Sequence, residues 1–216
     1  MYTLYSYYRS SCSWRVRLSL ELKCLPYTLH QINLLQNHQS SAEYLLVNPA
    51  GVVPALLLED GVTTITQSVA ILEYLEETNQ DKDVVKLLPD CPLKRALVRQ
   101  LVQIITADCQ PLQNLHVLRR FTELTDIDDK TTRQLWGRHY ITRALTAYTH
   151  LITPDTLFSF KDTVSLADLC LIPQLYNARR FGINVEEDFP QLAGIEANFM
   201  EKYPEAFNRA HPDNSQ

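Results

Sequence analysis

The sequence predicts an α+β protein in which a mixed α/β domain precedes an all-helical domain. Segments rich in β-favouring residues lie in the first third of the chain. Beyond residue 93 no segment predicts a strand, and apolar residues recur at helical spacing. Residues 79–92 contain Asp, Lys, Asn and two prolines, which is typical of a linker. We therefore expect a first domain over residues 1–79, a linker over 80–92 and a helical domain over 93–216.

Composition narrows the class of protein. The 216 residues are 45% apolar and 21% charged, as in ordinary globular proteins, and the net charge is −5. A net negative charge does not favour binding to nucleic acid or to an anionic membrane, so an acidic substrate would need a local basic pocket. No signal peptide or membrane-length apolar run is recognisable. We expect a cytoplasmic protein.

The cysteines do not form a recognisable pattern. There are five, an odd number, and they are widely spaced without a Cys-x-x-Cys motif. Neither a disulfide framework nor a structural zinc site is predicted. We expect no bound metal, and reduced thiols suit a cytoplasmic protein.

The first domain is predicted element by element. Strands are expected at Tyr2–Tyr8 and Tyr27–Leu34, and the interval between them suits a helical crossover joining parallel strands. Residues 35–44 are polar and predict a loop or short helix. Asp60-Gly61 lies between two apolar runs, Ala55–Leu58 and Val62–Ile65, which is a strong hairpin signal. With a final helix from Gln67-Ser68 to Glu77, this order is that of a thioredoxin-like domain.

The second domain is predicted to be helical throughout. Leu93, Leu97, Leu101 and Ile105 recur every four residues, and further helices are expected near residues 130–151, 165–181 and 191–203. Ser165 and Asp168 have the spacing of a capping box, to which we assign a folding role. Residues 212–216 are expected to be a frayed tail.

Residues 10–17, Ser-Ser-Cys-Ser-Trp-Arg-Val-Arg, are the most informative stretch. Three hydroxyls and a thiol stand where a helix should begin, and a helix N-terminus can hold an anion such as a thiolate. Taken alone, Ser10 or Ser11 would simply be an N-cap. The whole string, however, resembles the active-site signature of zeta-class glutathione transferases, the family that includes maleylacetoacetate isomerase. The resemblance covers nearly the whole chain and implies the glutathione transferase fold.

One pattern conflicts with this fold. Residues 14, 16, 18, 20 and 22 are apolar and alternate with polar residues, which by itself favours a strand. We predict a helix instead, because the resemblance implies a helix that is covered on more than one side.

The resemblance also implies which residues bind glutathione. Ser10, with the N–H groups of Ser11 and Cys12, would hold the thiolate. Val53 would present its backbone to the cysteinyl part through a cis bond to Pro54, although only about 5–6% of X-Pro bonds are cis. The γ-glutamyl carboxylate would lie at Gln67 and Ser68, and the glycyl end at Gln39. Ser68 alone would be an N-cap and Gln39 an ordinary surface residue.

Two further motifs lie in the helical domain. Gln110-Pro111-Leu112-Gln113-Asn114-Leu115 resembles a second zeta-class signature, and the comparison implies pocket residues Gln110, Asn114, Leu115 and His116. Alternatively, Pro111 begins or kinks a helix, and His116 serves packing or the surface. Arg180 matches an arginine that the family places near substrate carboxylates, and Arg15 is the other cationic candidate. Arginines late in a helix also suit the helix dipole.

The implied activity is glutathione-dependent cis–trans isomerisation of maleylacetoacetate to fumarylacetoacetate in tyrosine and phenylalanine breakdown, by a homodimer. A free thiol of pKa about 8.5 needs roughly 2.7 kcal/mol to lower its pKa by about two units. One hydrogen bond of about 1.5–3 kcal/mol and a helix N-terminus can supply this. Alternatives are a maleylpyruvate isomerase, a transferase acting on α-halo acids, a thiol–disulfide reductase led by Cys12, and a non-catalytic interaction module.

Overall fold

The computed structural model describes residues 1–79, 83–125 and 127–214. It separates into two compact units, and the first combines residues 1–86 with residues 203–216. The second unit comprises residues 87–202.

The first unit is built on a four-stranded sheet of order β2-β1-β3-β4. The strands are β1 (Tyr2–Ser6), β2 (Tyr27–Gln31), β3 (Ala55–Leu57) and β4 (Thr64–Thr66). β1 and β2 are parallel, whereas β3 is antiparallel to β1 and to β4. The predicted strands and hairpin are confirmed, although β1 and β2 end earlier than expected. At the hairpin, Asp60 accepts hydrogen bonds from the N–H groups of Val62 and Thr63.

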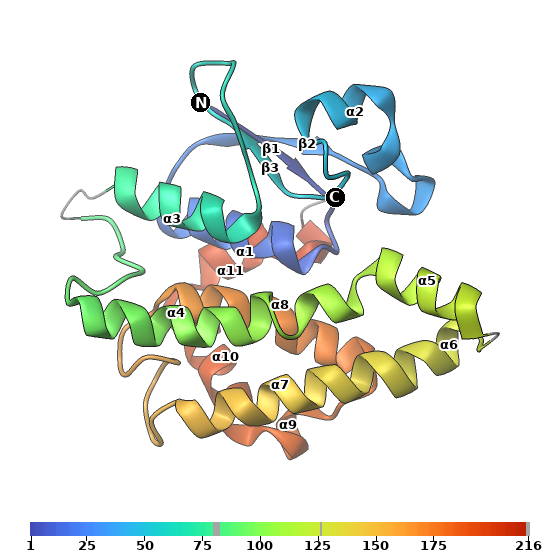
Figure 1. The fold of residues 1–216 in the computed structure, drawn as a ribbon. Coiled ribbons are helices and arrows are strands. Elements are labelled where there is room, and N and C mark those ends of the chain that lie inside the picture. Colours follow the sequence, from blue (N-terminus) through green and yellow to red (C-terminus); the bar gives the residue numbers. More distant parts are fainter. Residues whose placement is uncertain (80–82, 126, 215–216) are drawn as a thin grey trace. The chain divides into compact units, whose positions relative to one another are not determined.

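Helices cover both faces of this sheet. On one face lie α1 (Ser11–Leu22) and α3 (Ser68–Thr78), and on the other lies α2 (Ala42–Val47) (Figure 1). Two 3₁₀ turns, η1 (Leu34–Gln36) and η2 (His38–Ser40), precede α2. Leu4, Val16, Leu56 and Ile71 belong to the core on the α1 side, and a cluster on the α2 side contains Tyr7, Ile32, Tyr44 and Val53. The thioredoxin-like order is confirmed.

α1 is buried on nearly all sides, which explains its misleading alternation. Ten of its twelve residues are buried. It packs against α3 and against α11 (Pro204–Ala210), a short helix that the sequence did not predict. Trp14 meets the rings of Phe207 and His211 at centroid distances of 6.0 and 5.1 Å. A helix enclosed in this way has no polar face, so its hydrophobic period carries no helical signal.

The C-terminal segment groups with the first unit rather than with the helical domain in which the sequence placed it. Arg17 is a physical reason for this. Its fully buried guanidinium donates hydrogen bonds to the carbonyl oxygens of Ala210 and Tyr8 and to the hydroxyl of Ser6. The end of the chain is therefore tied to α1. Residues 212–214 form a 3₁₀ turn with Pro212 buried, so this part of the expected frayed tail is ordered, and residues 215–216 lie outside the described residues.

The second unit consists of helices and one isolated bridge between Phe158 and Lys161 over its described part. Its elements are α4 (Pro92–Thr106), η3 (Gln110–Gln113), α5 (Leu115–Thr125), α6 (Asp129–Thr132), a π-helical turn η4 (Arg133–Gly137), α7 (Arg138–Leu151), α8 (Leu166–Arg180), α9 (Val185–Asp188) and α10 (Pro190–Lys202). The predicted helices are confirmed. The sequence missed α5 and α9.

α4 does not bury the leucine row that predicted it. Leu93 and Leu97 are 69% and 43% exposed, whereas Val98, Leu101 and Val102 are buried. Leu93 and Leu97 thus lie on an exposed part of the α4 surface, although Val98 beside Leu97 is fully buried. The four-residue spacing found the helix but not its buried face.

The capping box at the start of α8 is confirmed. The buried carboxylate of Asp168 accepts hydrogen bonds from the N–H groups of Ser159 and Ser165, both at 2.7 Å, and from the Ser165 hydroxyl at 3.0 Å. Tyr148 donates to the Ser159 hydroxyl at 2.8 Å. Burial nevertheless raises the pKa of Asp168. Over the described residues, no helix combines the length and apolar character needed to cross a membrane.

Candidate functional site

Strand register brings three candidate segments to one edge of the sheet. Tyr5 on β1 pairs with Ala55 at the start of β3, and Ala55 pairs with Thr66 at the end of β4. The chain leaves β1 toward Ser10, enters β3 from Val53-Pro54 and leaves β4 into Gln67-Ser68. Residues far apart in the sequence are therefore neighbours at this edge.

The N-terminus of α1 has the geometry of a capped helix with a spare donor. Ser10 is the N-cap, and its hydroxyl oxygen accepts a hydrogen bond from the N–H of Ser13 at 3.2 Å. The Ser10 O–H can still donate to an anion. Ser11 is buried, Ser13 is fully buried, and Cys12 is a half-buried free thiol. The helix therefore presents Ser10 and Cys12 where its unpaired N–H groups lie.

The segment before β3 is held from behind. Val53-Pro54 is a cis peptide, as expected. The carbonyl oxygen of Val52 accepts hydrogen bonds from the Tyr44 hydroxyl at 2.8 Å and from the Asn48 side-chain amide at 2.6 Å. The sequence analysis did not assign a role to Tyr44 or Asn48, although the Asn48-Pro49 pair could have suggested a built turn. These two side chains fix the backbone next to Val53.

The N-terminus of α3 has a strained backbone and lies next to the positive charge of Arg15. Gln67, its N-cap, has φ +69°, a region that costs a residue with a side chain roughly 1–2 kcal/mol. Ser68 is buried, and its hydroxyl accepts a hydrogen bond from Nη1 of Arg15 at 3.3 Å. α1 and α3 are therefore linked at the edge where both begin.

Arg15 is the least satisfied charge of the first unit's site. Its side chain is only 1% exposed, and Nε and Nη2 have no hydrogen-bond partner in the described part of the chain. Arg17, two residues further along α1, donates hydrogen bonds to three acceptors. A buried cation with one neutral partner is unfavourable unless a negative charge compensates it. The arrangement is suited to an anion at Ser68.

Gln39 lies in η2 before α2, and its geometry is also specific. Its amide oxygen is buried and has no partner in the described chain. Gly51 lies beside it with φ +60°, and a Cβ atom there would approach the Gln39 carbonyl oxygen to 3.3 Å. Glycine is therefore favoured at 51 both by conformation and by this close approach.

The other candidate residues belong to the second unit. Gln110 begins the 3₁₀ turn η3, and Pro111 follows it, so this proline lies in the first turn of a helical segment. Asn114 accepts a hydrogen bond from the N–H of Leu115 at 2.9 Å, and His116 is exposed on α5. Gln113, which the sequence analysis did not single out, forms a buried amide pair with Gln174 of α8.

The two adjacent arginines of α8 differ in their partners. Arg179 bonds to Glu186 at 2.7 Å and to Glu196 at 2.5 Å, and these carboxylates raise its pKa. Arg180 is exposed, lies over the ring of Tyr176 at 5.8 Å and donates to Asn177 at 3.4 Å. The guanidinium of Arg179 is thus bound to two glutamates, whereas Arg180 makes no ion pair with either of them.

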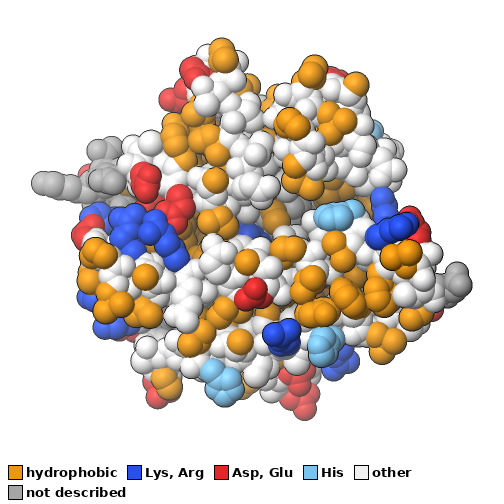
Figure 2. Space-filling view, in the orientation of Figure 1, with side chains coloured by type: hydrophobic (Ala, Val, Ile, Leu, Met, Phe, Trp, Pro, Cys, Tyr) orange, Lys and Arg blue, Asp and Glu red, His pale blue; other side chains and the backbone are white. Residues whose placement is uncertain are grey.

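A mostly apolar cavity of about 250 Å³ also lies in the second unit. The rings of Phe121, Trp136 and Tyr140 line it, and Trp136 is pinned by a hydrogen bond from Nε1 to the Leu112 carbonyl at 2.9 Å. Figure 2 shows hydrophobic side chains gathered on this face of the unit, near α5 and α7. Because mostly apolar side chains line this cavity, its lining does not indicate which class of ligand it would bind.

Comparison with known proteins shows the family. Residues 9–78 match the model of the glutathione S-transferase N-terminal domain. The chain is 44% identical over 214 residues to the probable maleylacetoacetate isomerase 2 of Drosophila melanogaster, covering 98% of this chain and 88% of that protein.

Two solved structures are also similar. One is maleyl pyruvate isomerase, a bacterial zeta-class glutathione S-transferase in its holo form, with TM-score 0.90, 32% identity and coverage of 98% of this chain and 97% of that chain. The other is maleylacetoacetate isomerase from Anaeromyxobacter dehalogenans 2CP-1 with dicarboxyethyl glutathione and citrate in its active site, with TM-score 0.84, 39% identity and coverage of 99% and 95%. The chain therefore belongs to the zeta-class glutathione transferases, the family of the maleylacetoacetate isomerases.

Proposed function

We propose that this protein is a glutathione-dependent isomerase that converts maleylacetoacetate to fumarylacetoacetate in tyrosine and phenylalanine degradation. The observation that carries the proposal is the paired start of α1 and α3, where Ser10 caps one helix and Arg15 supports Ser68 on the other. Strand register brings both starts, with Val53, to the same sheet edge. The family membership supports the reaction class.

The first unit fits glutathione along its length. The γ-glutamyl carboxylate suits the N-terminus of α3, because Ser68 can donate to it and Arg15 adds a positive charge. The cysteinyl backbone suits Val53, whose N–H and C=O have no hydrogen-bond partner in the described chain. The glycyl end suits Gln39, whose buried amide oxygen has no partner in the described chain and can accept a hydrogen bond from the glycyl N–H. Each part of the tripeptide thus meets a group of matching character.

Ser10 is the residue that stabilises the reactive sulfur. Its oxygen already accepts from Ser13, so its proton is directed to another acceptor. A hydrogen bond to an anion contributes about 1.5–3 kcal/mol, which with the dipole of α1 suffices to ionise a thiol near neutral pH. When bound, glutathione supplies the thiolate that adds to the cis double bond and leaves after rotation. Cys12 adjusts this site and is not itself the nucleophile.

Arg180 is proposed to hold the acid groups of the substrate. It is exposed and borders Asn177 and the ring of Tyr176, whereas Arg179 is bound to two glutamates. A guanidinium binds a carboxylate through two parallel hydrogen bonds. The solved relative with dicarboxyethyl glutathione and citrate in its active site supports an acidic ligand. Gln110, Asn114, Leu115 and His116 would line the same substrate pocket.

Thiol stoichiometry tests the reaction. With maleylacetoacetate, the rate should rise hyperbolically with glutathione while total free thiol stays constant over many turnovers. Loss of one thiol per product would identify a conjugating transferase. A rate no higher than that of glutathione alone would identify a binding module, and activity without glutathione would assign the nucleophile to Cys12.

Maleylpyruvate is the second candidate substrate, favoured by the structural likeness to maleyl pyruvate isomerase. A comparison of kcat/KM for the two keto acids decides between them. We further propose a cytoplasmic homodimer. Light scattering at micromolar protein should give about twice the chain mass of 24.9 kDa, and a single-chain mass would contradict this.

A further inference from the structure

A second concave site lies on the opposite face of the sheet from α1 and α3. It is a cavity of about 290 Å³ between α2 and the strands β1 and β2, and we call it the α2 cavity. Its lining residues are Tyr5, His30, Gln31, Ile32, His38, Ser41, Glu43, Tyr44 and Val47. None of the residues assigned to glutathione or substrate lines it. Its volume is close to the lower limit for small-molecule pockets, so a ligand there must be small.

Aromatic rings form one wall of the α2 cavity. The ring of Tyr5 lies 4.8 Å from that of His30 and 5.9 Å from that of Tyr44, with interplanar angles of 43° and 53°. The tilted arrangement presents ring surface in more than one direction. Burial raises the pKa of Tyr44 to about 12, so its phenol stays uncharged while its hydroxyl binds the Val52 carbonyl. The Tyr44 ring is therefore an uncharged π surface at neutral pH.

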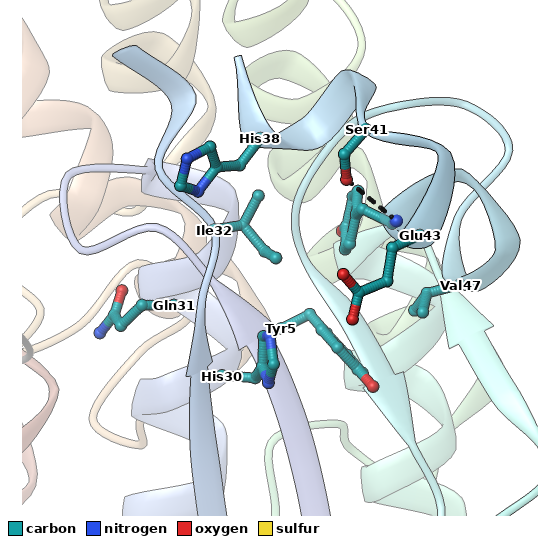
Figure 3. Close-up of a pocket in the computed structure, with 9 residues that line it drawn as sticks. Tyr5, His30, Gln31, Ile32, His38, Ser41, Glu43 and Val47 are labelled. Atoms are coloured by element: carbon teal, nitrogen blue, oxygen red, sulfur yellow. Dashed lines mark hydrogen bonds between the residues drawn. The ribbon is translucent and has the colours of Figure 1, made fainter. Parts of the chain in front are cut away.

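Glu43 supplies the charge of the α2 cavity. Figure 3 shows its carboxylate pointing from α2 across the cavity toward Tyr5. In the described chain this carboxylate makes no ion pair or side-chain hydrogen bond, and neither Lys nor Arg lines the cavity. No three His, Cys, Asp or Glu side chains of the described residues are grouped to hold a metal ion. The cavity therefore offers one negative charge beside aromatic faces.

We propose that the α2 cavity binds a small organic ammonium ion, held by Glu43 and by the rings of Tyr5, His30 and Tyr44. A cation within about 6 Å of an aromatic centroid is attracted by the ring, and a carboxylate adds a direct ionic contact. Anions would be repelled by Glu43, and a neutral ligand would gain nothing from its charge. The inference does not depend on the reaction at Ser10.

Choline and its uncharged carbon isostere, 3,3-dimethylbutan-1-ol, provide a matched test. Isothermal titration with the full chain should show one choline site in the millimolar range. The alcohol should bind at least about tenfold more weakly, because it has the same shape without the charge. Equal binding of the two compounds, or no choline binding up to 50 mM, would overturn the proposal.

Substitutions then locate the site. Glu43→Gln should weaken choline binding about tenfold, and Tyr5→Leu about three- to tenfold, whereas Tyr5→Phe should retain it. Glu201→Gln, at an exposed position on α10, is the matched control and should leave the affinity unchanged. Glu43 is exposed, so its variant should fold normally, as thermal unfolding can verify. Wild-type affinity in Glu43→Gln would refute the assignment.

Discussion

Replacing Arg15 by methionine should weaken glutathione binding without unfolding the protein. The substitution keeps most of the side-chain volume and removes a buried charge whose Nε and Nη2 atoms lack partners. Exchange of a poorly paired buried ion for an apolar residue of similar volume is often neutral or stabilising. We therefore expect the free energy of unfolding without ligand to fall by less than about 1 kcal/mol.

The effect on binding follows from the geometry at Ser68. Nη1 of Arg15 lies 3.3 Å from the Ser68 hydroxyl oxygen, and that hydroxyl would lie about 2.7 Å from a bound carboxylate. The two charges are then about 6 Å apart, and at an effective dielectric constant of about 20 they attract by about 2.8 kcal/mol. Loss of this attraction corresponds to a roughly 100-fold higher Kd for glutathione.

Arg17→Met is the matched control for Arg15→Met. Arg17 is equally buried, but its replacement removes three hydrogen bonds and leaves acceptors on Ala210, Ser6 and Tyr8 unsatisfied. The free energy of unfolding should therefore fall by about 2–5 kcal/mol. Its glutathione affinity should stay normal. Isothermal titration and denaturant unfolding measure both variants, and Arg15→Lys should recover part of the affinity because it keeps the charge. A Kd for Arg15→Met within threefold of wild type would refute the reasoning.

Three other substitutions test separate parts of the protein. Ser10→Ala should lower kcat about 10- to 100-fold by removing a hydrogen bond to the thiolate, while Cys12→Ala should have a milder effect; the reverse order in turnover assays would favour Cys12 as nucleophile. Arg180→Ala should raise KM for a dicarboxylic substrate more than for a neutral electrophile, and equal effects would assign Arg180 to structure. Asp168→Ala should lower the free energy of unfolding by about 3 kcal/mol, because it orphans the buried donors of Ser159 and Ser165. Burial raises the pKa of Asp168 above 3.8, so this carboxyl ionises at lower pH in the unfolded chain than in the folded protein. The wild type should therefore lose stability relative to Asp168→Asn as the pH rises from about 4 through the folded pKa. A stability difference that does not change with pH in urea unfolding would contradict this.

Local chemistry made much of this fold predictable. The Asp60-Gly61 turn, the capping box of Ser165 and Asp168, and the helix start at Ser10 each depend on side chains within three residues of the backbone that they organise. Such signals survive in a single sequence because the interaction is complete within one short segment. The site residues Ser10, Val53 and Ser68 were named from a motif, and strand register explains why they are neighbours.

Other features depend on contacts across many residues and have no local signature. The alternation in α1 indicates a strand until the sheet, α3 and α11 are known to enclose the helix. Leu93 and Leu97 are exposed although their spacing matches that of buried Leu101, because neighbouring elements decide which face of α4 is covered.

The hydrogen-bond partners of the two arginines in α1 are the clearest example of a feature that only the tertiary structure decided. Arg15 and Arg17 are two residues apart and equally buried in the structure, although the sequence pointed only to Arg15 as a candidate ligand residue. Arg17 donates to three acceptors from β1, the following loop and α11, whereas among the described residues Arg15 donates only to Ser68. The sequence by itself determined that α1 carries two arginines close to its N-terminus. Which of them retains unused donors was decided by the folded chain, because those acceptors come from segments up to 193 residues away.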